Sequence, residues 1–133
     1  MMNTTRRSKE RGQELLEFAL MFPVLFTLLM GVLDMGRAVY YNSVLYNAAR
    51  EGARYAIIYP DDTAGIEAAV HRLAVGLDPS VLMITTTVTA GPGADTVQVA
   101  LTYSFTPVTP LVANFFGASE VTMTNQATMQ VEQ

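Results

Sequence analysis

The chain has 133 residues, half of them apolar, a formal net charge of -4 and no cysteine. This length fits one small domain plus one additional element, and it is too short for a multidomain enzyme. The absence of cysteine from the sequence excludes a disulfide framework and a thiolate metal site.

Charge is distributed unevenly along the chain. The first twelve residues contain four basic side chains and one acidic side chain, whereas no lysine or arginine follows Arg72. Nucleic-acid binding needs a basic surface on a folded face, so we expect no nucleic-acid partner. We predict instead that residues 1–12 form a short basic leader.

A long apolar run follows this leader. Residues Leu15 to Leu33 contain a single charge, at Glu17. At about 1.5 Å per residue, a helix of this length measures about 28 Å, close to the ~30 Å hydrocarbon core of a bilayer. A secretory signal peptide is the alternative, but its apolar region usually has about 7 to 15 residues and precedes a small-residue cleavage site. No such site follows Leu33, so we predict a membrane span.

The flanking charges predict the orientation of this span. The basic leader places the N-terminus in the cytoplasm by the positive-inside rule. Residues 34–133 would then lie on the extracytoplasmic side of the cytoplasmic membrane, in a single-pass protein. Pro23 lies inside the span, where it removes a backbone hydrogen bond and predicts a bend.

The helical pattern continues beyond the span to about residue 57, so we expect one long helix over residues 13–57. At about 100° per residue, one face carries Tyr41, Leu45, Ala48, Gly52 and Tyr55. The small residues Ala48, Ala49, Gly52 and Ala53 would let another backbone approach closely. We therefore take these four as candidate helix-packing residues.

The opposite face of this helix is polar and includes Arg50 and Arg54. These two arginines can contact an acidic partner or form an ordinary solvated face. Two carboxylates in the following turn, Asp61 and Asp62, are expected to act in the turn and as a helix cap rather than in calcium binding. His71, the one histidine, lies off the apolar stripe of the next helix, so we expect a solvated surface residue there.

A small α+β domain is predicted over residues 58–133. Pro60 ends the long helix, and a second helix begins at Asp62 or Thr63 and closes before Gly76 and Pro79. Its apolar positions are Ile66, Ala69, Val70, Leu73 and Leu77. Three runs with alternating apolar residues follow, over residues 82–90, 97–106 and 121–131, and predict a three-stranded antiparallel sheet covered by helix. A Pro-bounded connection over residues 107–117 separates the last two runs.

This C-terminal part has only about 75 residues and no disulfide, so its own core is marginal. Burial against the long helix or against neighbouring subunits would add to it. We expect no catalytic site, since no Ser/His/Asp set, phosphate-binding loop or carboxylate pair can be assembled from the sequence. Nor do we expect a cofactor, a bound metal or a small-molecule substrate.

Glu17 is an unusual residue for its surroundings. A charged carboxylate inside a membrane costs on the order of 2.5 to 3.5 kcal/mol, so such residues usually have a partner or a function. The alternative is that Glu17 lies one turn inside the interface and extends toward water. The physical argument alone leaves both interpretations open.

The stretch "RGQELLEFALMFPVLFTLLMGVLDMGRAVYYNSVLYNAAREGARYA", residues 11–56, resembles the N-terminal signature of TadE-like (TadE/TadG) proteins, pilin-like components of tight-adherence (Tad) pilus systems. The matching features are the basic leader, Arg11-Gly12, the Glu17-Phe18-Ala19-Leu20 core, Pro23, Gly31, the Asp34 and Gly36 pair, and "AAREGAR" at 48–54. The resemblance is close over about the first 57 residues. Beyond them only the general layout agrees, including "YSFTP" and the closing "ATMQVE".

The resemblance implies a pilin-like fold, a processing site and an assembly residue. In type IV pilins a prepilin peptidase cuts after a glycine, and a glutamate is the fifth residue of the mature chain. On this sequence the cut would fall between Gly12 and Gln13, and Glu17 would be that fifth residue. Its carboxylate would pair with the new N-terminal amine of an adjacent subunit at the same depth. Major Tad pilins are short and commonly have Glu-Tyr where this chain has Glu17-Phe18, which favours a minor pilin or pseudopilin.

Two functions therefore follow from the sequence. The first is a minor pilin or pseudopilin of a Tad-type pilus, with the membrane, a prepilin peptidase and other Tad pilins and assembly proteins as partners, and a role in assembly and surface adhesion. The second is an unprocessed single-span anchor whose extracytoplasmic domain binds a ligand or acts as a scaffold.

Overall fold

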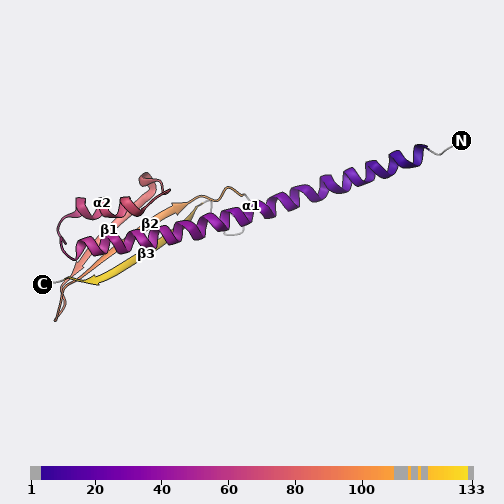
Figure 1. Ribbon diagram of the computed structural model, residues 1–133. Helices are drawn as coiled ribbons and strands as arrows, with labels where there is room; N and C mark the ends of the chain where they lie inside the picture. Colours follow the sequence, from indigo (N-terminus) through magenta and orange to yellow (C-terminus); the bar gives the residue numbers. More distant parts are fainter. Residues whose placement is uncertain (1–3, 110–113, 115–116, 118–119, 132–133) are drawn as a thin grey trace.

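A computed structural model describes residues 4–109, 114, 117 and 120–131, with side chains from Gly12 onward. It contains the long helix α1 (Thr4–Ala56), the second helix α2 (Thr63–Leu73), a short 3-10 turn (Pro79–Val81) and the strands β1 (Leu82–Thr89), β2 (Thr96–Phe105) and β3 (Val121–Gln130). Figure 1 shows these elements in chain order. The predicted α+β fold with two helices and a three-stranded antiparallel sheet is confirmed.

The ends of both helices differ from the sequence prediction. We expected the long helix to begin at residue 13, but α1 begins at Thr4 and ends at Ala56. The early start has a physical reason, since arginine, lysine and glutamate in the leader are good helix formers and a single glycine costs only about 1 kcal/mol. The helix also continues through Pro23, where the hydroxyl of Thr27 donates to the Pro23 carbonyl at 2.7 Å. The bend predicted at Pro23 stays a prediction.

The second helix is shorter than predicted. It ends at Leu73 rather than near Gly76, and the Ala74 amide donates the last helical hydrogen bond, to Val70. Gly76 has φ +80°, a left-handed conformation that other residues adopt only with strain. Leu77, expected on the helical stripe, is buried from the loop after α2, whereas Leu73 is 40% exposed.

The sheet has the order β1-β2-β3, with both pairs antiparallel. Strand β2 shows the predicted alternation, because its inward residues Val97, Val99, Leu101, Tyr103 and Phe105 are all buried. Part of the predicted connection over residues 107–117, and the end of the closing "ATMQVE" stretch, lie outside the described residues.

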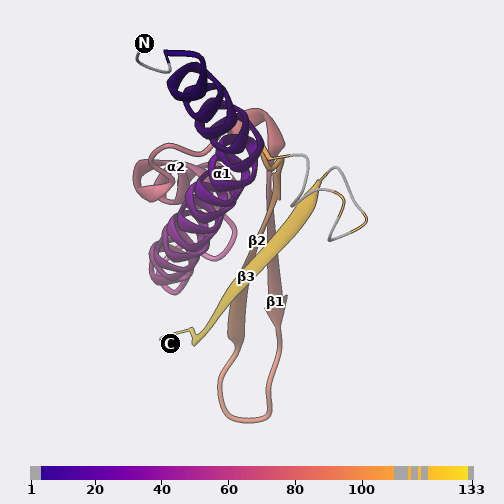
Figure 2. The same cartoon turned by 90° about the vertical axis from the view of Figure 1, so that its right-hand side faces the viewer.

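Both helices lie on the same face of the sheet. Figure 2 shows α1 and α2 side by side with the sheet on one side of them, and Gly52 of α1 lies where α2 and β2 meet. The core consists of the second half of α1, α2 and the inward residues of the strands, in particular Leu45, Ile66, Val70, Val97, Val99 and Leu101. We call this unit, with α1 from Asp34 onward, the head.

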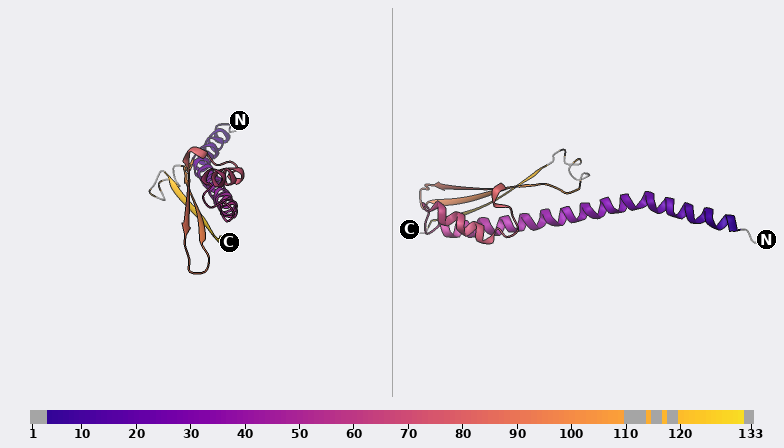
Figure 3. Two further views of the ribbon diagram at one scale, coloured as in Figure 1. Left: turned by 90° about the vertical axis from the view of Figure 1, so that its left-hand side faces the viewer. Right: turned by 90° about the horizontal axis from the view of Figure 1, so that it is seen from above.

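The first half of α1 projects away from the head. Figure 3 shows it extending as a single helix beyond the sheet. Its large apolar side chains are exposed, including Leu20 at 68%, Leu25 at 68% and Val32 at 68%. The first half of α1 therefore exposes its apolar side chains, whereas the second half contributes to the core of the head.

Candidate functional site

The point where α1 leaves its apolar stretch carries a buried carboxylate. Asp34, the first residue after the predicted span, is 3% exposed. Its Oδ2 accepts a hydrogen bond from the Thr109 amide at 2.7 Å, and its Oδ1 accepts one from the Val108 amide at 3.1 Å. The two amides follow the end of β2, so Asp34 ties the connection after β2 to α1.

Arg37, one turn further along α1, completes this cluster. Its guanidinium lies 3.5 Å from Asp34 Oδ1, stacks over the Phe105 ring at 5.1 Å and donates to the Tyr41 hydroxyl at 3.3 Å. The Tyr41 ring in turn meets the rings of Tyr103 and Phe105 edge-on, with centroids 5.5 Å apart. A cation on aromatic rings beside a carboxylate is held by several weak contacts at once.

The surroundings of Asp34 keep it charged. Burial raises the pKa of its carboxyl, whereas hydrogen bonds from Thr109 and Val108 and the charge of Arg37 lower it, and the net pKa lies below the ordinary value of 3.8. The hydrogen bond to Tyr41 raises the pKa of Arg37. Both groups therefore remain ionised at any physiological pH, and the cluster is a fixed anchor rather than a site of proton transfer.

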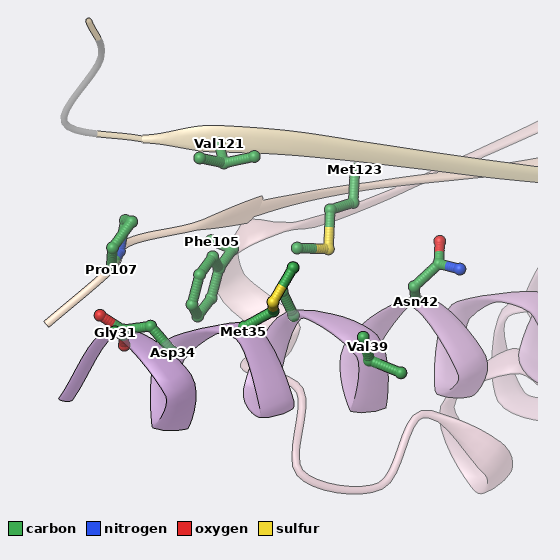
Figure 4. Close-up of a pocket in the computed structure, with 10 residues that line it drawn as sticks. Gly31, Asp34, Met35, Val39, Asn42, Phe105, Pro107, Val121 and Met123 are labelled. Carbon is green, nitrogen blue, oxygen red and sulfur yellow. The ribbon is translucent and has the colours of Figure 1, made fainter. Parts of the chain in front are cut away.

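An apolar groove of about 600 Å³ opens beside this anchor. One wall is α1 from Gly31 to Asn42, and the other is formed by the end of β2 and the start of β3. Figure 4 shows Met35 and Met123 pointing toward one another across it, with Phe105 and Val121 above the helix. The groove begins inside the predicted span and continues onto the head.

The predicted processing and assembly residues lie on the exposed first half of α1. Gly12 has no neighbouring atom within 4 Å of the position that a Cβ would occupy. Gln13, Glu17 and Phe18 are all exposed, and Phe18 is in contact with Phe22, with ring centroids 5.6 Å apart. Apart from this contact along α1, the structure brings these residues to no partner within the described part of this chain.

The predicted helix-packing residues have a partner inside the chain. Ala48, Ala49, Gly52 and Ala53 are buried in the core of the head. A Cβ at Gly52 would lie 2.6 Å from Val70 Cγ2 and 3.2 Å from Val99 Cγ1. The close approach that the small residues allow is therefore that of α2 and β2 of the same chain.

The two predicted surface arginines, Arg50 and Arg54, are exposed on α1. Arg50 lies over the Tyr46 ring at 5.6 Å, and Arg54 is 3.8 Å from Glu51. Glu51 makes a closer pair with Arg72 of α2, at 2.9 Å, so it links the two helices. This surface is polar and mixed in charge, which does not favour one class of partner.

The helix cap expected in the turn before α2 is confirmed at Asp62. Asp62 caps α2 by accepting from the Gly65 amide at 3.0 Å, and it also accepts from the Tyr55 hydroxyl at 2.8 Å. These hydrogen bonds lower the pKa of Asp62. Asp61 and His71 are exposed. Among the described residues no three His, Cys, Asp or Glu side chains form a candidate metal site.

Sequence reasoning missed the anchor at Asp34 and a contact between Asn42 and Asn125. Asn125 interrupts the apolar row of β3, and its Nδ2 donates to Asn42 Oδ1 on α1 at 2.8 Å. From the sequence, Asp34 is identified only as a residue of the family signature. A signal was available, because a carboxylate at the end of an apolar run needs a partner, but the partners are backbone amides more than 70 residues away.

Comparison with known proteins gives a match over part of the long helix α1. The family model described as TadE-like protein matches residues 12–54. No curated protein and no solved structure matches the chain. The matched segment lies on the one described helix that is long and apolar enough to cross a membrane. Over residues 12–54 the chain is similar to TadE-like proteins, which indicates a Tad pilus component, and the helix that carries this segment is a candidate membrane span.

Proposed function

We propose that this protein is a minor pilin or pseudopilin of a Tad-type pilus. The observation that carries the proposal is that the TadE-like segment lies on a helix whose apolar stretch is uncovered by the rest of the described chain. A bilayer covers that stretch before assembly, and neighbouring helices cover it in a filament. The head would lie outside the cytoplasm, where it contributes to assembly and to surface adhesion.

Exposed apolar residues beyond the span support packing against other subunits. Met35 is 72% exposed, Val39 62% and Tyr46 47%. The spacing of four and seven residues places them on one side of α1, and Met35 and Val39 line the apolar groove. Water would otherwise cover this strip, so a second helix against it is favourable.

Processing after Gly12 completes the proposal. The cut frees an ammonium at Gln13, and Glu17 lies four residues further, about one helical turn. Both residues are exposed, so the amine of one subunit can reach the carboxylate of its neighbour. A charge-assisted pair in a low-dielectric environment is strong, and it would align the axial positions of neighbouring helices.

The first experiment is the intact mass and N-terminal sequence of the protein from native membranes, with and without the prepilin peptidase. We expect a chain that starts at Gln13 only when the peptidase is present. A chain that retains residues 1–12 in both strains would contradict processing.

Glu17 is tested by substitution with a neighbouring carboxylate as control. We expect Glu17→Ala to leave membrane insertion unchanged and to reduce incorporation into pili severalfold, and Glu17→Gln to do the same because it removes the charge. Glu14→Ala, also exposed and on the same half of α1, should leave incorporation unchanged. Normal pili with Glu17→Ala would contradict the pairing role.

A permanent membrane anchor with an extracytoplasmic binding or scaffold domain is the second candidate. It is favoured by the continuity of α1 through Gly12, because a peptidase acts on an extended chain and a helix would first have to unwind there. An intact N-terminus together with absence of the protein from purified pili would support this function.

A further inference from the structure

The three strands carry no charged residue, no proline and no glycine. Their sequences are LMITTTVT in β1, TVQVALTYSF in β2 and VTMTNQATMQ in β3. Strands β1 and β3 form the two edges of the sheet, and within the described part of the chain nothing pairs with either outer edge. Exposed edges normally carry lysine, proline or a bulge, or are short, because an unprotected edge pairs with other chains.

None of these protections is present here. The edge strands have 8 and 10 residues, longer than the usual 5 to 6 or so. The register is one to one along both pairs, from Leu82 opposite Tyr103 to Thr89 opposite Thr96, and from Thr96 opposite Gln130 to Phe105 opposite Val121. Neither pair therefore contains a bulge. The outward residues of the three strands are also uncharged and mostly threonine and glutamine, so no charge on them repels a neighbouring strand.

We propose that heads of neighbouring copies pair edge to edge, with β3 of one chain beside β1 of the next. Two unprotected edges indicate this arrangement, because a two-fold dimer uses one edge twice and needs the other protected, whereas a head-to-tail series uses both. Strands β1 and β3 run in the same direction, since each is antiparallel to β2. Copies related by translation would therefore form a parallel pair.

The membrane anchor favours this geometry. Helices that cross the same bilayer in the same direction hold their heads at one height. Figure 1 shows the strands running roughly along α1, so neighbouring heads meet at their sheet edges rather than at their ends. The inference needs only the anchor and not the processing step, and it names a second copy of this chain as the partner.

Engineered cysteines test the pairing directly, because the sequence contains no cysteine. Thr128→Cys in β3 is combined, in three separate variants, with Thr85→Cys, Thr87→Cys or Thr89→Cys in β1, to cover neighbouring registers. All four threonines are exposed. Strands β1 and β3 are two strand spacings apart, about 9.6 Å, whereas a disulfide needs Cα atoms about 4.4 to 6.8 Å apart. A bond within one chain is therefore excluded.

After mild oxidation of membranes that contain the full chain, we expect dimers, trimers and longer products from at least one double variant. Coexpressed single variants should give dimers only. Adding Thr85→Lys on the edge strand to the double variants with Thr87→Cys or Thr89→Cys should reduce the longer products severalfold. Ala100→Lys, on the central strand opposite Thr85, should leave them unchanged.

Three outcomes would overturn the proposal. These are monomers in all three double variants, crosslinking of a single β1 variant to itself, and crosslinks whose mass shows a different protein. The N-terminus of the same samples is measured in parallel. Crosslinked chains that keep residues 1–12 contradict processing alone, and processed chains without crosslinks contradict edge pairing alone.

Discussion

The two halves of α1 have the same secondary structure and opposite relations to the rest of the chain. From Gly12 to Leu33 nearly every large apolar side chain is exposed, whereas from Asp34 to Ala56 one face is buried in the head. Asp34 lies at the boundary and is held by two amides of the connection after β2. Helix propensity and hydrophobicity therefore do not decide which half of α1 is buried. The second half is buried because the sheet and α2 pack against it.

Substitution of one leucine in each half of α1 should give the largest difference in stability between the two halves. Leu45 is 0% exposed and Leu25 is 68% exposed. We expect Leu45→Ala to lower the free energy of unfolding of the head by about 2 to 5 kcal/mol, because it leaves a cavity. Leu25→Ala should leave that free energy unchanged. The measurement is denaturant unfolding in detergent micelles, followed by far-UV circular dichroism, and equal losses from both variants would contradict the division.

Removing the boundary carboxylate should have the next largest effect. Asp34→Ala leaves the amides of Val108 and Thr109 without their acceptor, which costs on the order of 3 kcal/mol. Hydrogen exchange of these two amides should accelerate more than exchange in β2. Asp61→Ala, an exposed carboxylate in the turn before α2, is the control and should change neither quantity. Unchanged exchange at both amides in Asp34→Ala would show that they are held by something else.

Alanine substitutions at two glycines of α1 should change stability in opposite directions. Gly52→Ala places a Cβ 2.6 Å from Val70 Cγ2. Overpacking costs about 1 to 3 kcal/mol, and the better helix propensity of alanine offsets about 1 kcal/mol of that, so we expect a modest net loss of head stability. Gly36→Ala meets no atom within 4 Å and should stabilise the helix. Thermal unfolding of the two variants checks the opposite signs.

The ion pair between the helices should contribute little. Arg72 lies 2.9 Å from Glu51, but its side chain is 66% exposed. We expect Arg72→Ala to lower the free energy of unfolding by about 0.5 kcal/mol, and the difference from the unaltered protein should disappear at about 1 M salt. Arg54→Ala, at 3.8 Å from the same glutamate, should have a smaller effect still. A loss that persists in high salt would indicate packing rather than charge.

A change of pH within the physiological range should have the smallest effect on the stability of the head. The folded-state pKa of Asp34 lies below 3.8, so its contribution to stability is fully present above the unfolded value and is lost as pH falls through the folded value. We expect the contribution of Asp34 to be constant between about pH 8 and pH 5 and to decrease only below the ordinary carboxyl range. Comparison of the unaltered protein with Asp34→Asn across this range isolates that contribution, and a difference that changes near pH 6 would contradict the direction of the shift.

Much of the fold was predictable because local patterns were strong. Strict alternation in β2 identified its buried row, and the positions of Asp62 and Pro60 predicted the start of α2 and the end of α1. The helix ends were less predictable. The leader extends α1 because nothing in it stops a helix, and α2 stops at Leu73 because the chain must turn at Gly76 to reach β1.

By itself the sequence determined the apolar stretch, its length and its charge pattern, and with them the match to the TadE-like family model over residues 12–54. Those features depend on the order of residues along one helix. Only the tertiary structure decided that Asp34 accepts from Val108 and Thr109, that Gly52 packs on Val70 and Val99, and that both sheet edges are left unpaired within the described chain. The physical reason is that these contacts join residues far apart in the chain, and local periodicity does not specify which distant group completes a hydrogen bond or fills a space.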